Sequence, residues 1–463
     1  MTGSSGGVDE AAWDELGSGV RGALLREGDA GYDEARSVWN GMMDRHPAAV
    51  LQCLGVSDVM AGVNFARNHG LPLAVKGGGH NVAGKGVCDD GLTLDMSLMR
   101  SVRVDPGTLR ARAEAGALWR DFDHEAQTFG LTTTGGVVSS TGVAGLTLGG
   151  GIGYLTRTHG LACDNLLAAD VVTADGRLVQ ASENENPDLL WALRGGGGNF
   201  GVVTSLEFQL HEVGPDVAAA IVFYPLAAGA DVLHAYREYA EGAPDAVACY
   251  AMVVRGPADL PSEYAGQPVL AIIACYSGAV AEGLRALDPV GSFATPIAAT
   301  IEGTPYRAMQ QMFDPGSPHG VRYYWKSQYL SGLPDEFLET VVRFAREMPG
   351  AYTAIGIEPL GGAMERVDPA GTAYPHRRFP FNLGIWSGWD EPSEDSGVIS
   401  WTREFFEAVV PFGAGAYVNY LSDDEGGRVD EAYGDNYARL RQVKAQWDPG
   451  NLFRVNQNIA PRG

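Results

Sequence analysis

Six consecutive residues near the start of the chain combine close backbone approach with side chains that can react or donate hydrogen bonds. They are Lys76-Gly77-Gly78-Gly79-His80-Asn81, which follow an apolar run at residues 71–75 that we predict to be a strand. Because glycine has no Cβ, a ligand can come near this backbone, and successive N–H groups form a nest that binds anions. A pyrophosphate is therefore the natural ligand. The alternative is a glycine-rich turn that carries a surface histidine.

Two further glycine runs follow, at residues 149–153 (Gly-Gly-Gly-Ile-Gly) and at residues 195–198. The first is not the dinucleotide-binding fingerprint GxGxxG, because Tyr154 follows Gly153 and no third glycine stands in register. It predicts either close approach of a ligand or a bend that packs two strands together. The second run lies between a predicted helix and a predicted strand, where it lets two chain segments or a cofactor pack closely.

A fourth motif, Tyr417-Val418-Asn419-Tyr420, lies near the end of the sequence. We predict residues 416–421 to be a strand, in which Tyr417 and Asn419 share one face and Tyr420 points to the other. The phenol and amide groups of this segment are candidates for a reaction site. The alternative is that they are the tyrosines of a half-buried strand with no role in chemistry.

These four motifs, in this order, resemble those of the berberine bridge enzyme-like flavoproteins, a part of the vanillyl alcohol oxidase group with its PCMH-type FAD-binding domain. The resemblance covers about residues 32–461 and includes Cys163-Asp164-Asn165 and Ala174-Asp175-Gly176. It implies an α+β fold with a two-subdomain FAD-binding domain at residues 1–213. A substrate-binding domain with a large antiparallel sheet backed by helices would occupy residues 214–413. A berberine-bridge-type segment, residues 414–463, would return to the FAD domain.

The resemblance implies that FAD is the cofactor and that His80 is joined covalently to its 8α-methyl group. Further FAD contacts are expected at Lys76, Gly77, Gly78, Gly79, Asn81, Ser97, Gly116, Thr141, Gly142, Gly145, Gly149, Gly150, Gly153, Val203, Asn419 and Asn456. Many members of the family attach the flavin a second time, through a cysteine at a fixed distance before the GGG run. That position is Val138, and Cys163 belongs to a later segment, so we expect a single covalent link.

The resemblance also implies a residue that takes a proton from the substrate. Several relatives place a tyrosine where this chain has Ile152, so Tyr154 is a candidate replacement, after Tyr417 as the best base and Tyr420 as the second. A phenol has a pKa of about 10 and is a poor base at neutral pH unless its anion is stabilised. Basic side chains of the substrate domain are candidates for that stabilisation; they are Arg322 and Lys326.

The implied reaction is the transfer of hydride from a C–H next to a hydroxyl or amine of a small organic substrate, a secondary metabolite, to the flavin. Reoxidation by O2 would release H2O2. Thr141 stands where the family has a residue that controls oxygen access, and its small side chain favours an oxidase. The alternatives are a sugar or oligosaccharide oxidase, a flavin-dependent monooxygenase or cyclase of natural-product biosynthesis, and a non-catalytic flavin or ligand carrier.

Aromatic residues in the second half of the sequence favour an apolar, flat-walled substrate cavity, although most of them could instead belong to the core of a sheet. They are Tyr323, Tyr324, Trp325, Tyr329, Trp386 and Trp389. An aromatic or polyketide-like substrate would suit such walls better than a free sugar.

The motifs must be held by alternating strands and helices. Ser57 is expected to cap a helix that Gly70 ends, and residues 118–129 predict a helix that Gly130 ends. Residues 169–173 and 177–181 predict a hairpin, and Pro187 opens a short helix. Further strands are predicted at residues 109–115, 217–224, 247–254, 269–276, 352–358 and 381–386, and helices at 335–347, 394–410 and 429–446.

Composition excludes several classes of partner. The 463 residues carry a net charge of −24, which repels nucleic acid. Their apolar runs are shorter than the roughly 20 residues of a membrane span. The five cysteines form no CxxC pair, so neither a zinc site nor a disulfide framework is expected. The composition thus predicts no metal and a cytoplasmic location, and the resemblance adds a small-molecule substrate and O2 as partners. We expect a monomer or homodimer.

Overall fold

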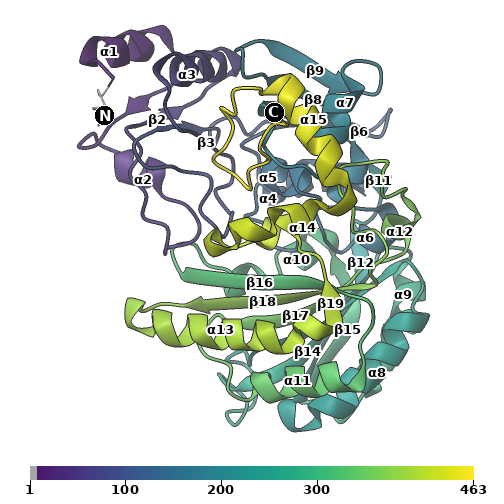
Figure 1. The fold of residues 1–463 in the computed structure, drawn as a ribbon. Coiled ribbons are helices and arrows are strands. Elements are labelled where there is room, and N and C mark those ends of the chain that lie inside the picture. The colour runs from purple at the N-terminus through teal and green to yellow at the C-terminus, as the bar shows by residue number, and fades with distance from the viewer. Residues whose placement is uncertain (1–7, 463) are drawn as a thin grey trace.

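The computed structural model describes residues 8–462, which form two lobes that lie one above the other in Figure 1. The N-terminal lobe contains the chain up to residue 213, and the large-sheet lobe contains residues 216–414. The segment after residue 415, yellow in Figure 1, returns to the N-terminal lobe. The fold is α+β, as predicted. The division into functional domains at residues 213 and 413 stays a prediction.

Three sheets build the N-terminal lobe. In the first, β2 and β3 both pair in parallel with β4, and β1 is antiparallel to β2. Its strands are β1 (Leu24–Leu25), β2 (Ala49–Gln52), β4 (Leu92–Asp95) and β3 (Leu73–Lys76). The second is wholly antiparallel, in the order β5 (Val102–Asp105), β6 (Arg110–Glu114), β10 (Val202–Gln209), β8 (Leu166–Val172) and β9 (Leu178–Ser182). The third pairs β7 (Leu131–Thr132) with β11 (His211–Glu212).

The helices of this lobe connect and cover these sheets. They are α1 (Glu10–Gly19), α2 (Tyr32–Arg36), α3 (Val56–His69), α4 (Trp119–Ala126), α5 (Val143–Leu148), α6 (Thr156–His159) and α7 (Pro187–Leu193). Helix α3 buries Val59, Val63 and Ala66 on one face and ends at the left-handed Gly70, as its sequence pattern predicts. The expected cap was wrong, because Ser57 lies inside the helix and the residue before its first turn is Gly55, which has no side chain to donate or accept.

One eight-stranded antiparallel sheet forms the large-sheet lobe. Its order is β15 (Ala298–Pro305), β12 (Asp216–Pro225), β14 (Pro268–Tyr276), β13 (Val247–Arg255), β17 (Ala354–Pro359), β18 (Phe381–Trp389), β16 (Arg322–Leu330) and β19 (Gly413–Ala414). Its helices are α8 (Gly229–Gly242), α9 (Val280–Leu287), α10 (Tyr306–Gln310), α11 (Asp335–Ala345), α12 (Ala363–Arg366) and α13 (Asp395–Val409). The large antiparallel sheet backed by helices was predicted, but strands β15 and β16 were missed.

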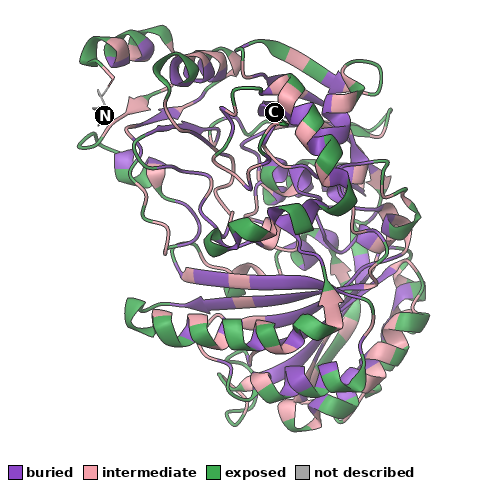
Figure 2. Ribbon diagram, viewed as in Figure 1, coloured by how far each residue is buried: buried purple, intermediate pink, exposed green. Residues whose placement is uncertain are grey.

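The two faces of the large sheet have different neighbours. Helices α8, α11 and α13 bury one face, and their exposed residues point away from the sheet (Figure 2). The other face is turned toward the N-terminal lobe, where Trp39 packs on Tyr323 of β16. Because side chains alternate along a strand, Tyr323 and Trp325 face that lobe, whereas Tyr324 packs with Val398 of α13.

The C-terminal segment differs from its prediction in two places. Residues 416–421 form no strand; Val418–Tyr420 is a 3₁₀ turn, closed by the bond from Tyr420 N–H to Tyr417 C=O at 2.9 Å. The helix expected at residues 429–446 is broken into α14 (Val429–Tyr433) and α15 (Tyr437–Trp447). The break lies at Gly434, whose φ of +44° is left-handed, a conformation that ends helices and that glycine adopts without strain.

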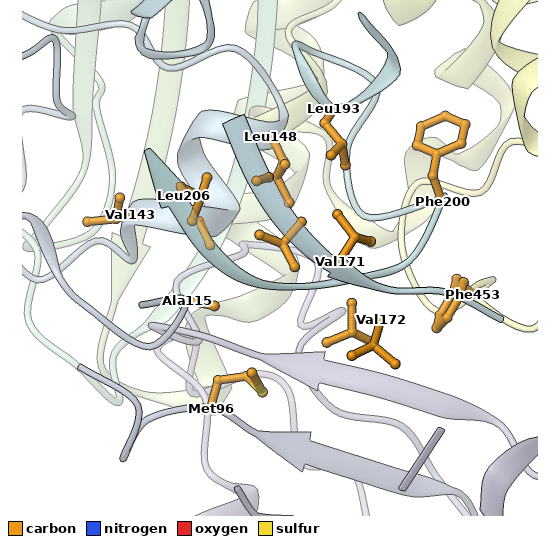
Figure 3. Packing of buried hydrophobic residues seen from close by; sticks show 14 of the residues in the cluster. Met96, Ala115, Val143, Leu148, Val171, Val172, Leu193, Phe200, Leu206 and Phe453 are labelled. Atoms are coloured by element: carbon orange, nitrogen blue, oxygen red, sulfur yellow. The ribbon is translucent and has the colours of Figure 1, made fainter. Parts of the chain in front are cut away.

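The core of the N-terminal lobe includes residues from the far end of the chain. Phe453 packs near Val171 and Val172 of β8, and Leu206 of β10 lies in the same cluster (Figure 3). Phe453 is fully buried. The C-terminal segment is therefore part of the apolar core of this lobe and does not merely lie on its surface.

A buried polar contact joins the lobes. Gln310 of α10 donates from Nε2 to Asp123 Oδ2 of α4 at 3.2 Å, and Thr132 Oγ1 donates to Asp123 Oδ1 at 3.3 Å. Burial raises the pKa of Asp123 to about 7, although these two hydrogen bonds act in the opposite direction. The carboxyl group therefore titrates near neutral pH.

Candidate cofactor and active site

A cavity of about 290 Å3 lies between the lobes, and its walls come from widely separated parts of the sequence. The turn after β3, the loop before α5, the glycine run before β10, strand β16 and the C-terminal segment all contribute. Of the predicted site residues, those that line the cavity are Lys76, Gly77, Gly78, Gly79, His80, Asn81, Thr141, Gly142, Gly145, Gly149, Val203, Asn419, Tyr420 and Asn456.

The turn after β3 lies against the loop before α5 with no room for side chains. A Cβ on Gly78 would lie 2.5 Å from the backbone N of Gly142, so only glycine lets these two segments meet. Gly79, next in the turn, has a left-handed φ of +66°. The result is an open strip of backbone at the cavity wall, which a dinucleotide can approach closely.

Lys76 supports this turn and is held by partners of its own. Its Nζ lies 3.4 Å from Asp95 Oδ2 and donates to the backbone oxygen of Ala35. The side chain is buried, and these two partners from the same lobe compensate its charge. Lys76 therefore ties α2 and β4 to the cavity wall.

His80 is the reactive group of the turn. Its Nε2 lies 3.2 Å from Ser140 Oγ, and its ring stacks on Trp39 with a centroid separation of 4.3 Å. Burial lowers the pKa of His80 to about 3, so the imidazole is neutral at physiological pH. A neutral imidazole keeps a lone pair and is a nucleophile.

The glycine run at residues 149–153 contributes unequally to the wall. Gly149 lines the cavity and lies so close to Asn419 that a Cβ would be 2.0 Å from Asn419 Oδ1. Gly150 and Gly153 do not line it; they pack against Tyr374 and against the backbone of Gly135. These two glycines therefore allow close packing between chain segments, and neither Tyr374 nor Gly135 lies in a strand.

Two other expected FAD contacts lie away from the cavity. Gly116 packs on the backbone oxygen of Met96, where a Cβ would be only 1.9 Å away. Ser97 is absent from the lining and donates its N–H to Asp95 Oδ1. Both residues belong to the turns that carry the wall, and neither reaches it.

A buried ion pair fixes the glycine run at residues 195–198 and the C-terminal segment to each other. Lys444 Nζ lies 2.6 Å from Asp448 Oδ2 and also donates to the backbone oxygens of Asn199 and Phe453. Asp448 accepts the N–H groups of Leu452 and Phe453. Both charged side chains are fully buried. This clamp holds two segments that line the cavity, and its only signal in the sequence is the i,i+4 spacing of Lys444 and Asp448.

Asn456 lies at the edge of this clamp. Its Nδ2 donates to Gly198 O at 3.2 Å and to Phe453 O at 3.1 Å. Its Oδ1 is buried without a hydrogen-bond partner. A ligand donor at this wall would satisfy that oxygen, since buried polar atoms are rarely left unpaired.

The three candidate bases occupy different surroundings. Tyr417 is buried behind the wall, and its hydroxyl accepts from Gly151 N–H and from Asn419 Nδ2, each at 2.9 Å. Burial raises the pKa of Tyr417. Tyr154 lies in a separate apolar cluster beside Tyr250, outside the cavity, and burial raises its pKa as well. We therefore assign Tyr154 no part in the chemistry.

Tyr420 lines the cavity and is joined to a carboxyl group that sequence reasoning missed. Its hydroxyl donates to Glu358 Oε1 at 3.0 Å, and Asn382 Nδ2 donates to Glu358 Oε2 at 2.6 Å. Burial raises the pKa of Glu358 to about 7, so this group can accept a proton near neutral pH. One signal was available: Glu358 is a lone carboxylate in the apolar run of β17.

The basic residues expected to stabilise a tyrosine anion form ion pairs with carboxylates outside the cavity. Arg322 forms a bidentate ion pair with Asp395 of α13, and Lys326 pairs with Asp424 and Glu425. Neither residue lines the cavity. Of the six expected pocket aromatics, Trp325 alone is in the cavity wall.

Three positions at which the sequence was compared with the resembling flavoproteins also lie at the cavity. Val138, Thr141 and Ile152 all line it. Cys163 does not, and burial raises the pKa of its thiol, which leaves it protonated and unreactive. Val138 thus occupies the wall where a second attachment would need sulfur.

Comparison with known proteins identifies the family. The FAD binding domain model matches residues 47–182, and the Berberine and berberine like model matches residues 416–460. An FAD-linked oxidoreductase of Dictyostelium discoideum is 30% identical over 452 residues, which cover 96% of each chain. The chain belongs to the berberine bridge enzyme-like family of FAD-linked oxidoreductases.

Other relatives of this berberine bridge enzyme-like protein carry names with substrates. The (R)-6-hydroxynicotine oxidase of Paenarthrobacter nicotinovorans is 30% identical over 472 residues, covering 96% of this chain and 98% of the relative. The structure of xylooligosaccharide oxidase from Myceliophthora thermophila C1 in complex with xylobiose is 27% identical, with a TM-score of 0.84 over 98% of this chain and 100% of that chain.

Family membership confirms three predictions: the PCMH-type FAD-binding fold, FAD as the cofactor, and the class of FAD-dependent oxidoreductase. The glycine-lined wall and the unpaired Asn456 oxygen fit this cofactor. Among residues 8–462, no helix has the length and apolar character needed to cross a bilayer. The same residues contain no group of three or more His, Cys, Asp or Glu side chains placed to hold a metal ion.

Proposed function

We propose that this berberine bridge enzyme-like protein is an oxidase that removes hydride from a C–H next to a hydroxyl or amine of a small organic substrate, a secondary metabolite. Bound FAD supplies a two-electron acceptor that takes the hydride and passes the electrons to O2 with release of H2O2. The contact between Tyr420 and Glu358 carries the proposal, because the substrate O–H or N–H must lose a proton as its C–H bond breaks.

Backbone groups and amides of the cavity wall would hold the cofactor. The turn at residues 77–79 and Gly142 offer close backbone approach, and Asn81, Asn419 and Asn456 offer polar side chains. His80 would form a single covalent link to the 8α-methyl group. Support for this comes from its neutral imidazole at the wall and from Val138 at the position of a second attachment.

The proton is expected to travel through Tyr420 to Glu358. Tyr420 lines the cavity and its hydroxyl already donates to Glu358, so we expect it to receive a substrate proton while it gives its own to the carboxylate. Asn382 fixes the second carboxylate oxygen. Tyr417 was the preferred base from sequence, but it does not line the cavity, and burial raises its pKa although the donors Gly151 N–H and Asn419 Nδ2 act in the opposite direction. It is better suited to orienting Gly151 and Asn419.

The walls favour a flat, apolar substrate. Trp325, Tyr420 and Ile152 line the cavity, and Trp325 and Tyr420 meet edge to face at 5.4 Å. The hydroxynicotine in the name of one relative is a small aromatic compound, which agrees with these walls. The xylooligosaccharide in the name of another keeps a sugar oxidase as the second candidate.

Anaerobic reduction of the bound flavin tests the proposal. Purified protein is mixed with aromatic alcohols, aromatic amines and xylooligosaccharides, and loss of the visible flavin band is recorded before air is admitted. Reduction by an aromatic compound, followed by H2O2 release in air, is expected. Reduction by oligosaccharides alone would assign a sugar oxidase, incorporation of labelled oxygen into the product would assign a monooxygenase, and no reduction by any compound would favour a carrier.

The covalent link has a separate test. Denatured protein should keep its flavin fluorescence after acid treatment, and His80→Ala should lose it. Acid-stable fluorescence in the variant would refute the link at His80.

A further inference from the structure

His80 is the first of three stacked aromatic rings that extend from the N-terminal lobe into the large-sheet lobe. Its imidazole lies on the Trp39 indole at a centroid separation of 4.3 Å and an interplanar angle of 18°. The other face of Trp39 lies on Tyr323 of β16 at 3.7 Å and 9°. The indole is therefore enclosed between two nearly parallel rings, and it defines the plane in which His80 lies.

Hydrogen bonds fix Trp39 at the centre of the stack. Its indole Nε1 donates to the backbone oxygen of Ser317 at 3.1 Å, and its backbone N–H donates to Gly79 at 3.0 Å. The neighbouring Asn40 is buried and bridges the lobes: its Nδ2 donates to Tyr323 O at 2.9 Å, and its Oδ1 accepts the Tyr323 N–H at 2.9 Å. These hydrogen bonds of Trp39 and Asn40 fix the Trp39 indole between His80 and Tyr323.

Ser140 contacts one ring nitrogen of the His80 imidazole. Its Oγ lies 3.2 Å from His80 Nε2 and has no other hydrogen-bond partner among the described side chains. When Nε2 donates to this oxygen, the proton is held on Nε2 and the lone pair is left on Nδ1. Trp39 sets the plane of the ring, and the contact with Ser140 sets its rotation.

We propose that Trp39, Tyr323 and Ser140 are positioning residues for the covalent attachment of FAD to His80. The inference rests on the proposed His80 link. In the attachment, an imidazole nitrogen forms a bond to the 8α carbon, and a methyl C–H and the imidazole N–H each lose a proton to solvent. The two electrons pass to the isoalloxazine and then to O2, which takes up two protons and leaves as H2O2.

The argument is one of orientation. A neutral imidazole on a free side chain would rotate about χ1 and χ2, and little of its time would be spent with the nucleophilic nitrogen toward the methyl group. A ring held by one stacked face and one hydrogen bond is already oriented, which lowers the entropic part of the barrier. Because Tyr323 belongs to β16, the large-sheet lobe must be docked before the stack is complete.

Matched variants of the full chain test each contact. Ser140→Ala removes the hydrogen bond and Ser140→Thr restores a hydroxyl. Trp39→Ala removes the stack and Trp39→Phe keeps an aromatic ring. Tyr323→Ala removes the supporting ring, whereas Tyr323→Phe keeps it and loses only the hydroxyl that donates to Pro318 O. Protein from riboflavin-limited cells is incubated with FAD, and the covalent fraction is followed over time by intact mass and acid-stable fluorescence.

We expect Ser140→Ala to slow attachment by roughly tenfold, the factor that one ordinary hydrogen bond supplies. Trp39→Ala and Tyr323→Ala should slow it as well, and the Thr and Phe variants should recover most of the rate. Total bound FAD, measured before denaturation, should be nearly unchanged in Ser140→Ala. Attachment at the wild-type rate in any of the three alanine variants would remove that residue from the proposal.

His80→Ala separates this inference from the proposed link. Acid-stable FAD in His80→Ala would overturn the link and the positioning role together. Loss of acid-stable FAD there, with wild-type rates in all three alanine variants, would overturn the positioning role alone. Should Trp39→Ala fail to fold, Tyr323→Ala and Ser140→Ala still decide the result, since wild-type attachment in both would contradict the predicted roles of the stack and of the Ser140 hydroxyl.

Discussion

Tyr420 lines the cavity and its hydroxyl donates to Glu358 Oε1 at 3.0 Å, so a hydrogen bond joins the two residues, from different lobes, that we propose as a proton path. Tyr420 comes from the segment that returns to the N-terminal lobe, and Glu358 comes from the large sheet. Neither residue could act as the base alone. A phenol is a weak base, and a fully buried carboxylate cannot reach a substrate. Their contact makes the docking of the lobes part of the chemistry.

Glu358→Gln should lower kcat/KM by about 10²-fold or more, the size of a general-base contribution. Glu358 must be ionised to accept a proton and its pKa is raised to about 7, so wild-type activity should rise as pH increases through about 7. The variant should lack this rise. A pH profile of flavin reduction measures both effects, with the exposed Glu365→Gln as control. An unchanged profile in Glu358→Gln would remove Glu358 from the path.

Tyr420→Phe and Tyr417→Phe should have opposite effects on rate and stability. Tyr420→Phe removes the hydroxyl at the wall and should slow flavin reduction by about 10²-fold. Tyr417→Phe leaves the buried Gly151 N–H without its acceptor and should destabilise the protein by about 1–3 kcal/mol with a smaller effect on reduction. Stopped-flow reduction and thermal unfolding distinguish the two. Slower reduction in Tyr417→Phe than in Tyr420→Phe would restore Tyr417 as the base.

Asp123→Asn should make unfolding less dependent on pH. The pKa of Asp123 is about 7 in the folded protein and about 4 when unfolded, so between these pH values the native state holds a proton that the unfolded state has lost. Its contribution to stability is present at acid pH and is lost as pH rises through about 7. The difference between the Tm of the variant and that of the wild type should therefore shift in favour of the variant as pH rises from 5 to 8. The exposed Asp231→Asn should show no such gain.

Lys444→Met should destabilise the protein by about 3–5 kcal/mol, because it leaves the Asp448 carboxylate buried without its cation. The double variant Lys444→Met/Asp448→Asn removes both charges, and its amide oxygen can still accept from Leu452 or Phe453. It should recover part of the loss. Urea unfolding measures both variants. Equal stability of single and double variants would show that the pair is not what holds the C-terminal segment.

The sequence predicted the backbone of the site better than its chemistry. Gly77 to Gly79 and His80 were identified because glycine runs leave a visible pattern beside a strand. Glu358 was missed because its importance depends on a neighbour from another lobe, Tyr420, which no spacing reveals. Lys444 was missed for the same reason: its partners Asn199 and Phe453 become neighbours only in the fold.

Local signals also failed where tertiary contacts outweigh propensity. Residues 416–421 alternate as a strand would, yet Tyr417 is held by Gly151 and Asn419 in place of a neighbouring strand. Strand β16 was missed because its aromatic residues suggested a pocket. Ser57 suggested a cap by type, but the helix begins one residue earlier, at Val56.

The cavity wall includes Val455, Asn456 and Gln457 together with residues as early as Leu73. During synthesis, a nascent chain that has emerged only as far as the large sheet still lacks this wall. FAD can therefore be fully enclosed only once residues 455–457 have been synthesised and have folded back onto the N-terminal lobe.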